Sequence, residues 1–168
     1  GVKNTPIEIT AEGSGRIEQM LDVINREPLN LVTKYGLKPQ DITGDASVQF
    51  ALTVPQESDD PNEQVAFSVV AKGEHVTLPK IAQHVTLDSG VLDLKINQSE
   101  LEGRGRIAIN GAPADIVWRE QFASKSATPS EFTLHTSLDE EARTSLGFDT
   151  GTNLTGPVVV DVTARGRG

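Results

Sequence analysis

The sequence predicts a mainly β protein with short α-helices, built on an antiparallel sheet that is apolar on one face only. Three consecutive strands between residues 90 and 120 carry this prediction. In the first, Leu92, Leu94 and Ile96 alternate with polar residues, and a period of two is typical of a half-buried strand. The second and third strands are joined by Asn110-Gly111, a dipeptide typical of a tight hairpin.

The second strand has Leu101, Ile107 and Ile109 on one parity, with Gly103 and Gly105 between them. Glycine inside a strand usually marks a bend, a bulge or a close approach by another group. The third strand places Ala112, Ala114, Ile116 and Trp118 on one side, and Asp115, Val117 and Arg119 on the other. The three strands therefore form a meander with one apolar and one polar face.

The N-terminal part combines a strand with helices. Residues 6–11 alternate as a short strand, and the Gly-Ser-Gly at 13–15 is expected to end it, with Ser14 capping a helix. The helix has apolar residues at helical spacing, namely Ile17, Met20, Leu21 and Ile24. A second short helix is expected over residues 29–35, because Gly36 follows it as a natural C-terminal residue.

Further strands extend the sheet on both sides of the meander. One has alternate apolar residues at Ala46, Val48, Phe50, Leu52 and Val54, and another at Val65, Phe67, Val69 and Ala71. Residues 56–64 form a polar loop between them, and shorter pieces are expected near 76–78 and 85–87. After the meander, we expect a strand from Phe132, a short helix over 138–146 and a valine-rich strand over 157–164.

Composition excludes several classes of protein. The formal net charge of −9, from 24 acidic and 15 basic residues, argues against nucleic acid as a partner, since phosphate binding needs basic patches. The chain has no cysteine, which excludes disulfides and thiolate metal sites but leaves the compartment open. No run approaches the roughly 20 apolar residues of a membrane span. We interpret the chain as a fragment whose anchor or export signal would lie outside it.

A repeated pattern indicates a longer array. Helix, glycine, linker and strand occur twice, with Gly36 and Gly147 111 residues apart and Gly44 and Gly156 112 residues apart. Near-equal spacing is typical of repeat proteins. We therefore expect residues 1–168 to form a single fragment, about one repeat unit with flanking helix–strand elements at 1–42 and 138–168.

The sequence contains no arrangement that predicts catalysis. Motifs of hydrolases, nucleotide-binding loops and zinc proteases are absent. The three histidines, His75, His84 and His135, have no partner at metal-ligand or triad spacing, and we interpret them as surface or structural residues. We expect no catalytic residues, no cofactor and no metal.

Four segments, residues 24–37, 42–55, 87–122 and 138–162, resemble in sequence and in order the conserved unit of the AsmA-like proteins of Gram-negative bacteria, closest to the YhdP branch. The likeness covers roughly Ile7 to Val162. It implies a large protein anchored in the inner membrane, whose periplasmic part is a highly curved β-sheet of repeating β-groove units, open along one side and partly capped by helices. Such proteins are thought to let phospholipids pass from the inner to the outer membrane in outer-membrane biogenesis.

The apolar stripes and this resemblance together predict a hydrophobic groove that binds phospholipid or another acyl-chain lipid. Its expected lining is Val48, Phe50, Leu52, Phe67, Val69, Leu92, Leu94, Ile96, Ile107, Ile109, Ile116, Trp118, Phe132 and Leu134. The expected partners are lipid and neighbouring groove units of a longer chain, with a dimer through the edge strands possible for the isolated fragment. Two alternatives stay open: a closed β-sandwich acting as a periplasmic scaffold or adhesin, and an enzyme using scattered carboxylates.

Overall fold

The computed structural model describes residues 6–24, 38–55, 65–82, 85–122, 130–148 and 154–166. These hold eight strands: β1 (Ile7–Arg16), β2 (Thr43–Val54), β3 (Ala66–Ala82), β4 (Val85–Asn97), β5 (Glu100–Ile109), β6 (Ala112–Gln121), β7 (Ser130–Leu138) and β8 (Val158–Gly166). Every strand pairs antiparallel with its neighbours in sequence, so the sheet order is β1 to β8 without a crossover. The expected helix over residues 29–35 and the loop over 56–64 lie outside the described residues.

The helical segments lie at one rim of this sheet. The α1 helix (Ile17–Ile24) follows β1 and the 3-10 helix η1 (Pro39–Asp41) precedes β2, whereas α3 (Glu140–Ser145) lies between β7 and β8. The strands alternate in direction, and an even number of them lies between the β1–β2 crossover and the β7–β8 crossover. Both crossovers therefore lie along the same side of the sheet, where β1 and β7 end. We call these ends the helix rim, and the opposite ends, at 97–100 and 121–122, the distal rim.

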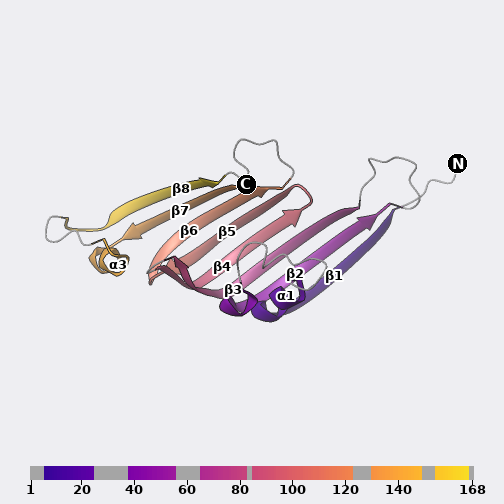
Figure 1. The fold of residues 1–168 in the computed structure, drawn as a ribbon, viewed down its shortest axis with the longest axis horizontal. Helices are drawn as coiled ribbons and strands as arrows, with labels where there is room; N and C mark the ends of the chain where they lie inside the picture. The colour runs from indigo at the N-terminus through magenta and orange to yellow at the C-terminus, as the bar shows by residue number, and fades with distance from the viewer. Residues whose placement is uncertain are drawn as a thin grey trace.

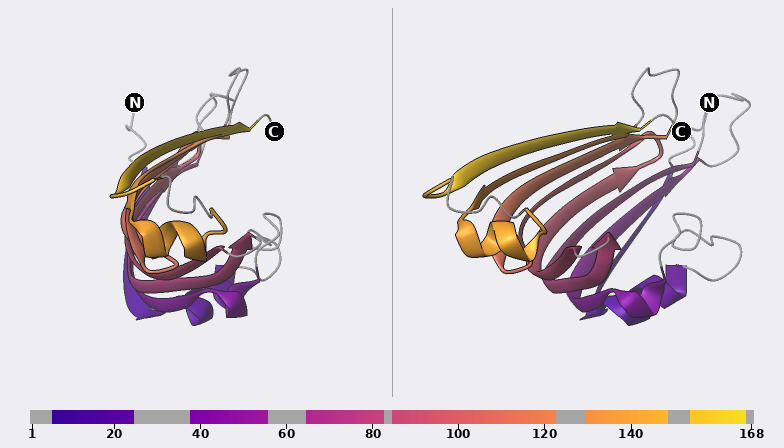
Figure 2. Two further views of the ribbon diagram at one scale, coloured as in Figure 1. Left: turned by 90° about the vertical axis from the view of Figure 1, so that its left-hand side faces the viewer. Right: turned by 60° about the vertical axis from the view of Figure 1, so that its left-hand side comes forward.

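The sheet is strongly curved and does not close. Its strands stack along the long axis of the molecule, with β1 and β8 as the two free edges (Figure 1). Seen along that axis, the strands bend into an arc that is open on one side, and α3 lies inside the outline of the arc (Figure 2, left). The predicted fold class, a mainly β protein with a curved antiparallel sheet forming an open groove and two short helices, is confirmed.

The first strand is longer than the sequence analysis expected, and the prediction that Ser14 caps a helix is wrong. Gly13, Ser14 and Gly15 pair with β2 residues in the sheet ladder, and the helix begins only at Ile17. The Met20 methyl group of the helix that follows lies 4.0 Å from where a Cβ of Gly13 would stand, an ordinary van der Waals contact. Pairing with a distant strand outweighs the local capping signal.

Turn chemistry matches the predicted meander. Asn110 and Gly111 have φ values of 47° and 81°, which the Asn-Gly dipeptide adopts at little cost in a type I′ turn. At the distal rim, the Asn97 side-chain oxygen accepts hydrogen bonds from the backbone N–H groups of Ser99 (2.9 Å) and Glu100 (3.0 Å). These local interactions set the register of β4 to β6.

Each helix-bearing crossover leads into the next strand at a glycine with positive φ. Gly44 at the start of β2 and Gly156 just before β8 both have positive φ, 139° and 89°. The larger repeat array itself stays a prediction.

Candidate functional site: an apolar trough

Strand register places every residue of the predicted lining on one face of the sheet, here called the apolar face. Directly paired residues of an antiparallel ladder share a face, and the pairs link the strands in turn. They are Leu52 with Phe67, Phe50 with Val69, Val69 with Ile96, Leu92 with Gly105, Leu94 with Gly103, Gly103 with Trp118, Ile116 with Leu134, and Trp118 with Phe132. Val48 pairs with Ala71 and Ile109 with Leu87 on the same face.

The opposite, polar face carries rows of alternating charge. Lys95, Glu102, Arg119, Glu131 and Arg165 follow one another across β4 to β8 in register. Salt bridges join Arg165 to Glu131 at 2.8 Å and Arg119 to Glu102 at 3.9 Å. These exposed ion pairs stabilise the fold little individually, but they solvate this face and oppose a slipped register, which would bring like charges together.

Glycines on the apolar face allow the tight bend. A Cβ on Gly105 would stand 2.5 Å from the Val91 carbonyl oxygen and would also meet the Leu92 side chain, and one on Gly103 would stand 2.9 Å from Leu94 Cδ2. The leucines therefore lie over the glycines of the next strand. Bending a sheet toward one face crowds the side chains there, so small residues in these rows permit the arc to form with the apolar face inside.

Burial divides the apolar face into two zones. Near the helix rim, Leu87 (6% exposed), Ile107 (4%) and Ala114 (3%) form a small core against which Leu78 and Ile109 pack. The rest of the predicted lining is half-buried. Ile107 is therefore a core residue of the described fold, whereas side chains such as Phe50 line accessible surface inside the arc. We call this accessible part the trough.

The helices pack at the helix rim, where the Met20 side chain of α1 lies beside Gly13 and Gly15 of the apolar face. In α3, Arg143 is 3% exposed, and its guanidinium donates hydrogen bonds to the carbonyls of Leu138 (3.2 Å), Gly156 (2.7 Å) and Leu154 (3.0 Å). This side chain fastens the crossover between β7 and β8 to the sheet. The N-cap Asp139 accepts from the Ala142 N–H at 2.8 Å, as the acidic first turn indicates.

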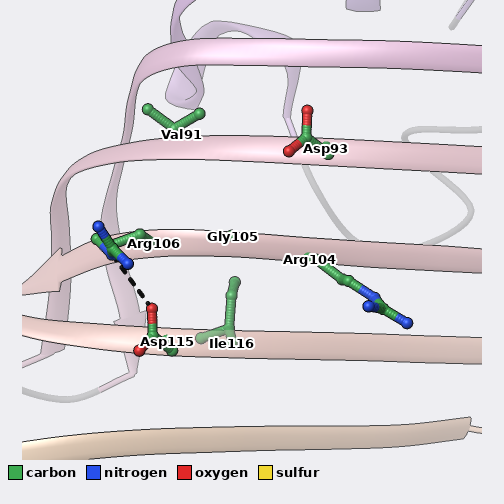
Figure 3. A pocket seen from close by; sticks show the side chains of 7 residues that line it. All are labelled: Val91, Asp93, Arg104, Gly105, Arg106, Asp115 and Ile116. Carbon is green, nitrogen blue, oxygen red and sulfur yellow. Dashed lines mark hydrogen bonds and ion pairs between the residues drawn. The ribbon is translucent and has the colours of Figure 1, made fainter.

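An open depression lies on the polar face (Figure 3). It is lined by Val91, Asp93, Arg104, Gly105, Arg106, Asp115 and Ile116. Arg106 is paired with Asp115 at 3.4 Å, and both side chains are exposed. Nearby, the hydrogen bond from His135 Nδ1 to Asp161 (2.7 Å) raises the pKa of the exposed His135 imidazole.

The structure adds residues to the apolar face that the sequence analysis left out. Ile9 and Val162 extend it onto the edge strands, where they are 48% and 45% exposed. Glu120 and Ser130 pair with each other on the same face at the distal rim. Strand parity was the signal for Glu120, since it follows Ile116 and Trp118 at the same period of two.

The fold and this face define a single-layer, half-pipe β protein whose inner surface is apolar. Comparison with protein-family models, with curated proteins and with solved structures finds no match for the chain. Among the described residues, no three His, Cys, Asp or Glu side chains are grouped so as to hold a metal ion. No helix within the described ranges is both long enough and apolar enough to cross a membrane.

Proposed function

We propose that this chain is a lipid-transfer module whose trough carries phospholipid acyl chains between the inner and outer membranes of a Gram-negative cell. In this proposal it is a periplasmic segment of a longer AsmA-like protein anchored in the inner membrane, and it acts without catalysis. The observation that carries the proposal is an apolar face that runs across all eight strands with no second layer over it in the described part of the chain.

The energetics favour an apolar ligand on this face. Large apolar patches on soluble proteins usually mark binding surfaces, because leaving them in water is unfavourable. Each methylene group removed from water contributes about 0.8 kcal/mol, so eight methylenes of one acyl chain would contribute about 6 kcal/mol. The half-buried trough residues are aliphatic and aromatic with few polar groups, a surface over which an acyl chain can bind and still slide.

The main alternative, a closed β-sandwich acting as a scaffold or adhesin, requires the same side chains to interlock with a second sheet. The described residues form one sheet with two free edges, β1 and β8. An apolar ligand or a neighbouring unit would have to supply the missing contacts. The open arc therefore supports the lipid-transfer proposal over the scaffold.

The test uses two adjacent valines of β3. Val69 lies on the apolar face between Phe50 and Ile96, whereas Val70 lies on the polar face and is 46% exposed. Val69→Asp places a charge in the trough and should reduce bound phospholipid at least about tenfold, since the carboxylate must be desolvated by an acyl chain. Bound lipid is measured by native mass spectrometry after incubation with phospholipid vesicles.

Val70→Asp is the matched control, because it adds the same charge at the neighbouring position, opposite Lys95, and should leave lipid binding unchanged. Circular dichroism verifies that both variants fold. Equal lipid binding by the folded Val69→Asp protein and the wild type would contradict the proposal. A wild-type chain that takes up no lipid would favour the scaffold.

A further inference from the structure

The apolar face carries one charged group in the block of strands from β5 to β8. Among the described positions of this block, Glu120 is the sole charged residue on the apolar face, and it lies at the distal rim in β6. Its register partners are Leu101 in β5 and Ser130 in β7. A half-buried acidic residue on an otherwise uncharged face is unfavourable unless a donor or a cation satisfies its carboxylate, so its position requires an explanation.

Two aromatic residues lie beside this carboxylate on the same face. Trp118 precedes Glu120 by two residues in β6 and pairs with Phe132 in β7, while Glu120 pairs with Ser130 in β7. Paired Cβ atoms across an antiparallel ladder are about 5 Å apart, and residues two apart along a strand are separated by about 7 Å. The aromatic pair, Trp118 and Phe132, therefore lies directly beside the polar pair, Glu120 and Ser130. All four residues are half-buried and accessible.

This combination of groups fits an ammonium ion. The faces of Trp and Phe rings attract cations within about 6 Å of the ring centre, and aromatic groups of this kind recognise quaternary ammonium ligands. The Glu120 carboxylate supplies the opposite charge, and the Ser130 hydroxyl can donate to a phosphate oxygen. No Lys or Arg occupies a described apolar-face position in β5 to β8, so this part of the trough offers an anion no ionic partner.

We propose that Trp118, Phe132, Glu120 and Ser130 bind the ammonium head group of a zwitterionic phospholipid at the distal rim while its acyl chains lie in the trough. This inference rests on the proposed lipid-transfer function and names its substrate class. The head group stays at the rim, where water is accessible, and the tail extends over Leu94 and Val69 on the same face. Lipids whose head groups carry only negative charge bind less tightly.

The experiment compares short-chain lipids with identical acyl chains, each below its critical micelle concentration, by isothermal titration calorimetry. Phosphatidylcholine and phosphatidylethanolamine should bind about tenfold more tightly than phosphatidylglycerol, a difference of about 1.4 kcal/mol. Glu120→Gln should reduce this preference to less than about twofold, and Trp118→Leu should weaken the choline lipid most. Choline alone, at the same concentration, should give no measurable binding, because it lacks the acyl chains.

The control variant is Glu100→Gln, which removes a carboxylate from the polar face at the same rim and should keep the full preference. If all three lipids bind equally and Glu120→Gln changes nothing, the head-group site is refuted while lipid binding stands. If none of the lipids binds, the lipid-transfer function fails as well. Choline that binds as tightly as the choline lipid would indicate a small-amine site and would also overturn the inference.

Discussion

A methyl group added at Gly105 should destabilise the fold strongly, although glycine is intrinsically unfavourable in a strand. Gly105→Ala places a Cβ 2.5 Å from the Val91 carbonyl oxygen and against the Leu92 side chain. The carbonyl belongs to the ladder of β4 and cannot rotate away, so β4 and β5 must separate locally. Overpacking of this kind costs about 1–3 kcal/mol, a large part of the stability of a domain of this size.

The matched substitution is Gly13→Ala on the same face of edge strand β1. The nearest atom to its added Cβ is the Met20 methyl group at 4.0 Å, an ordinary contact at the end of a flexible side chain. Alanine also restricts the unfolded chain more than glycine does. Gly13→Ala should therefore leave stability unchanged or raise it by up to about 1 kcal/mol.

Urea denaturation followed by circular dichroism measures both effects. With a slope of about 2 kcal/mol per molar urea, a loss of 2 kcal/mol lowers the midpoint by about 1 M. Gly105→Ala should show this shift and Gly13→Ala should not. Equal midpoints for the two variants would refute the argument that glycine on the apolar face permits the close approach of β4 and β5.

Two further predictions concern the polar face and the helix rim. Because Asp161 raises the pKa of His135 in the folded state above its ordinary value of 6.5, this pair stabilises the fold below about pH 6.5, and the contribution is lost as pH rises through the raised pKa. Asp161→Asn should reduce the difference between urea midpoints at pH 5.5 and 8, and an unchanged difference would contradict the pairing. Arg143→Met leaves three carbonyls without their donor and should lower the free energy of unfolding by at least about 2 kcal/mol. The stability of Arg143→Lys should lie between that of the Met variant and that of the wild type. A Met variant as stable as the wild type in thermal denaturation would show that these hydrogen bonds are dispensable.

The two faces of the sheet could be predicted from sequence because strand periodicity is local. Alternation at Leu92, Leu94 and Ile96 assigns them to one face whatever the partner strand is, and the Asn110-Gly111 turn then determines how β5 and β6 pair. Register carries that assignment across the sheet, so the whole predicted lining fell on one face. Extending the alternation of Ile116 and Trp118 by two more residues would also have placed Glu120 on the apolar face.

Features that depend on distant parts of the chain could not be read in this way. The Gly-Ser-Gly at 13–15 is a plausible helix start by local chemistry, yet it continues β1 because β2 pairs with it. Likewise, Ile107 and Leu94 look equivalent in sequence, but Ile107 packs into the core with Leu87 and Leu94 lies over Gly103. The difference arises from curvature, which brings strands together unequally along their length.

Curvature also explains how a single-layer sheet can be stable and still present an apolar surface. A flat sheet needs a second layer to bury one face, whereas bending lets side chains of that face bury one another, as Leu87, Ile107 and Ala114 do. The burial is partial, because the arc stays open, and residues such as Ile9 remain about half exposed. What remains exposed is the area from which an acyl chain would exclude water, so occupancy of the trough and stability of the sheet must be linked. A ligand at 100 times its Kd would add about 2.7 kcal/mol to the free energy of unfolding, whereas a scaffold with a sealed core would gain nothing from lipid.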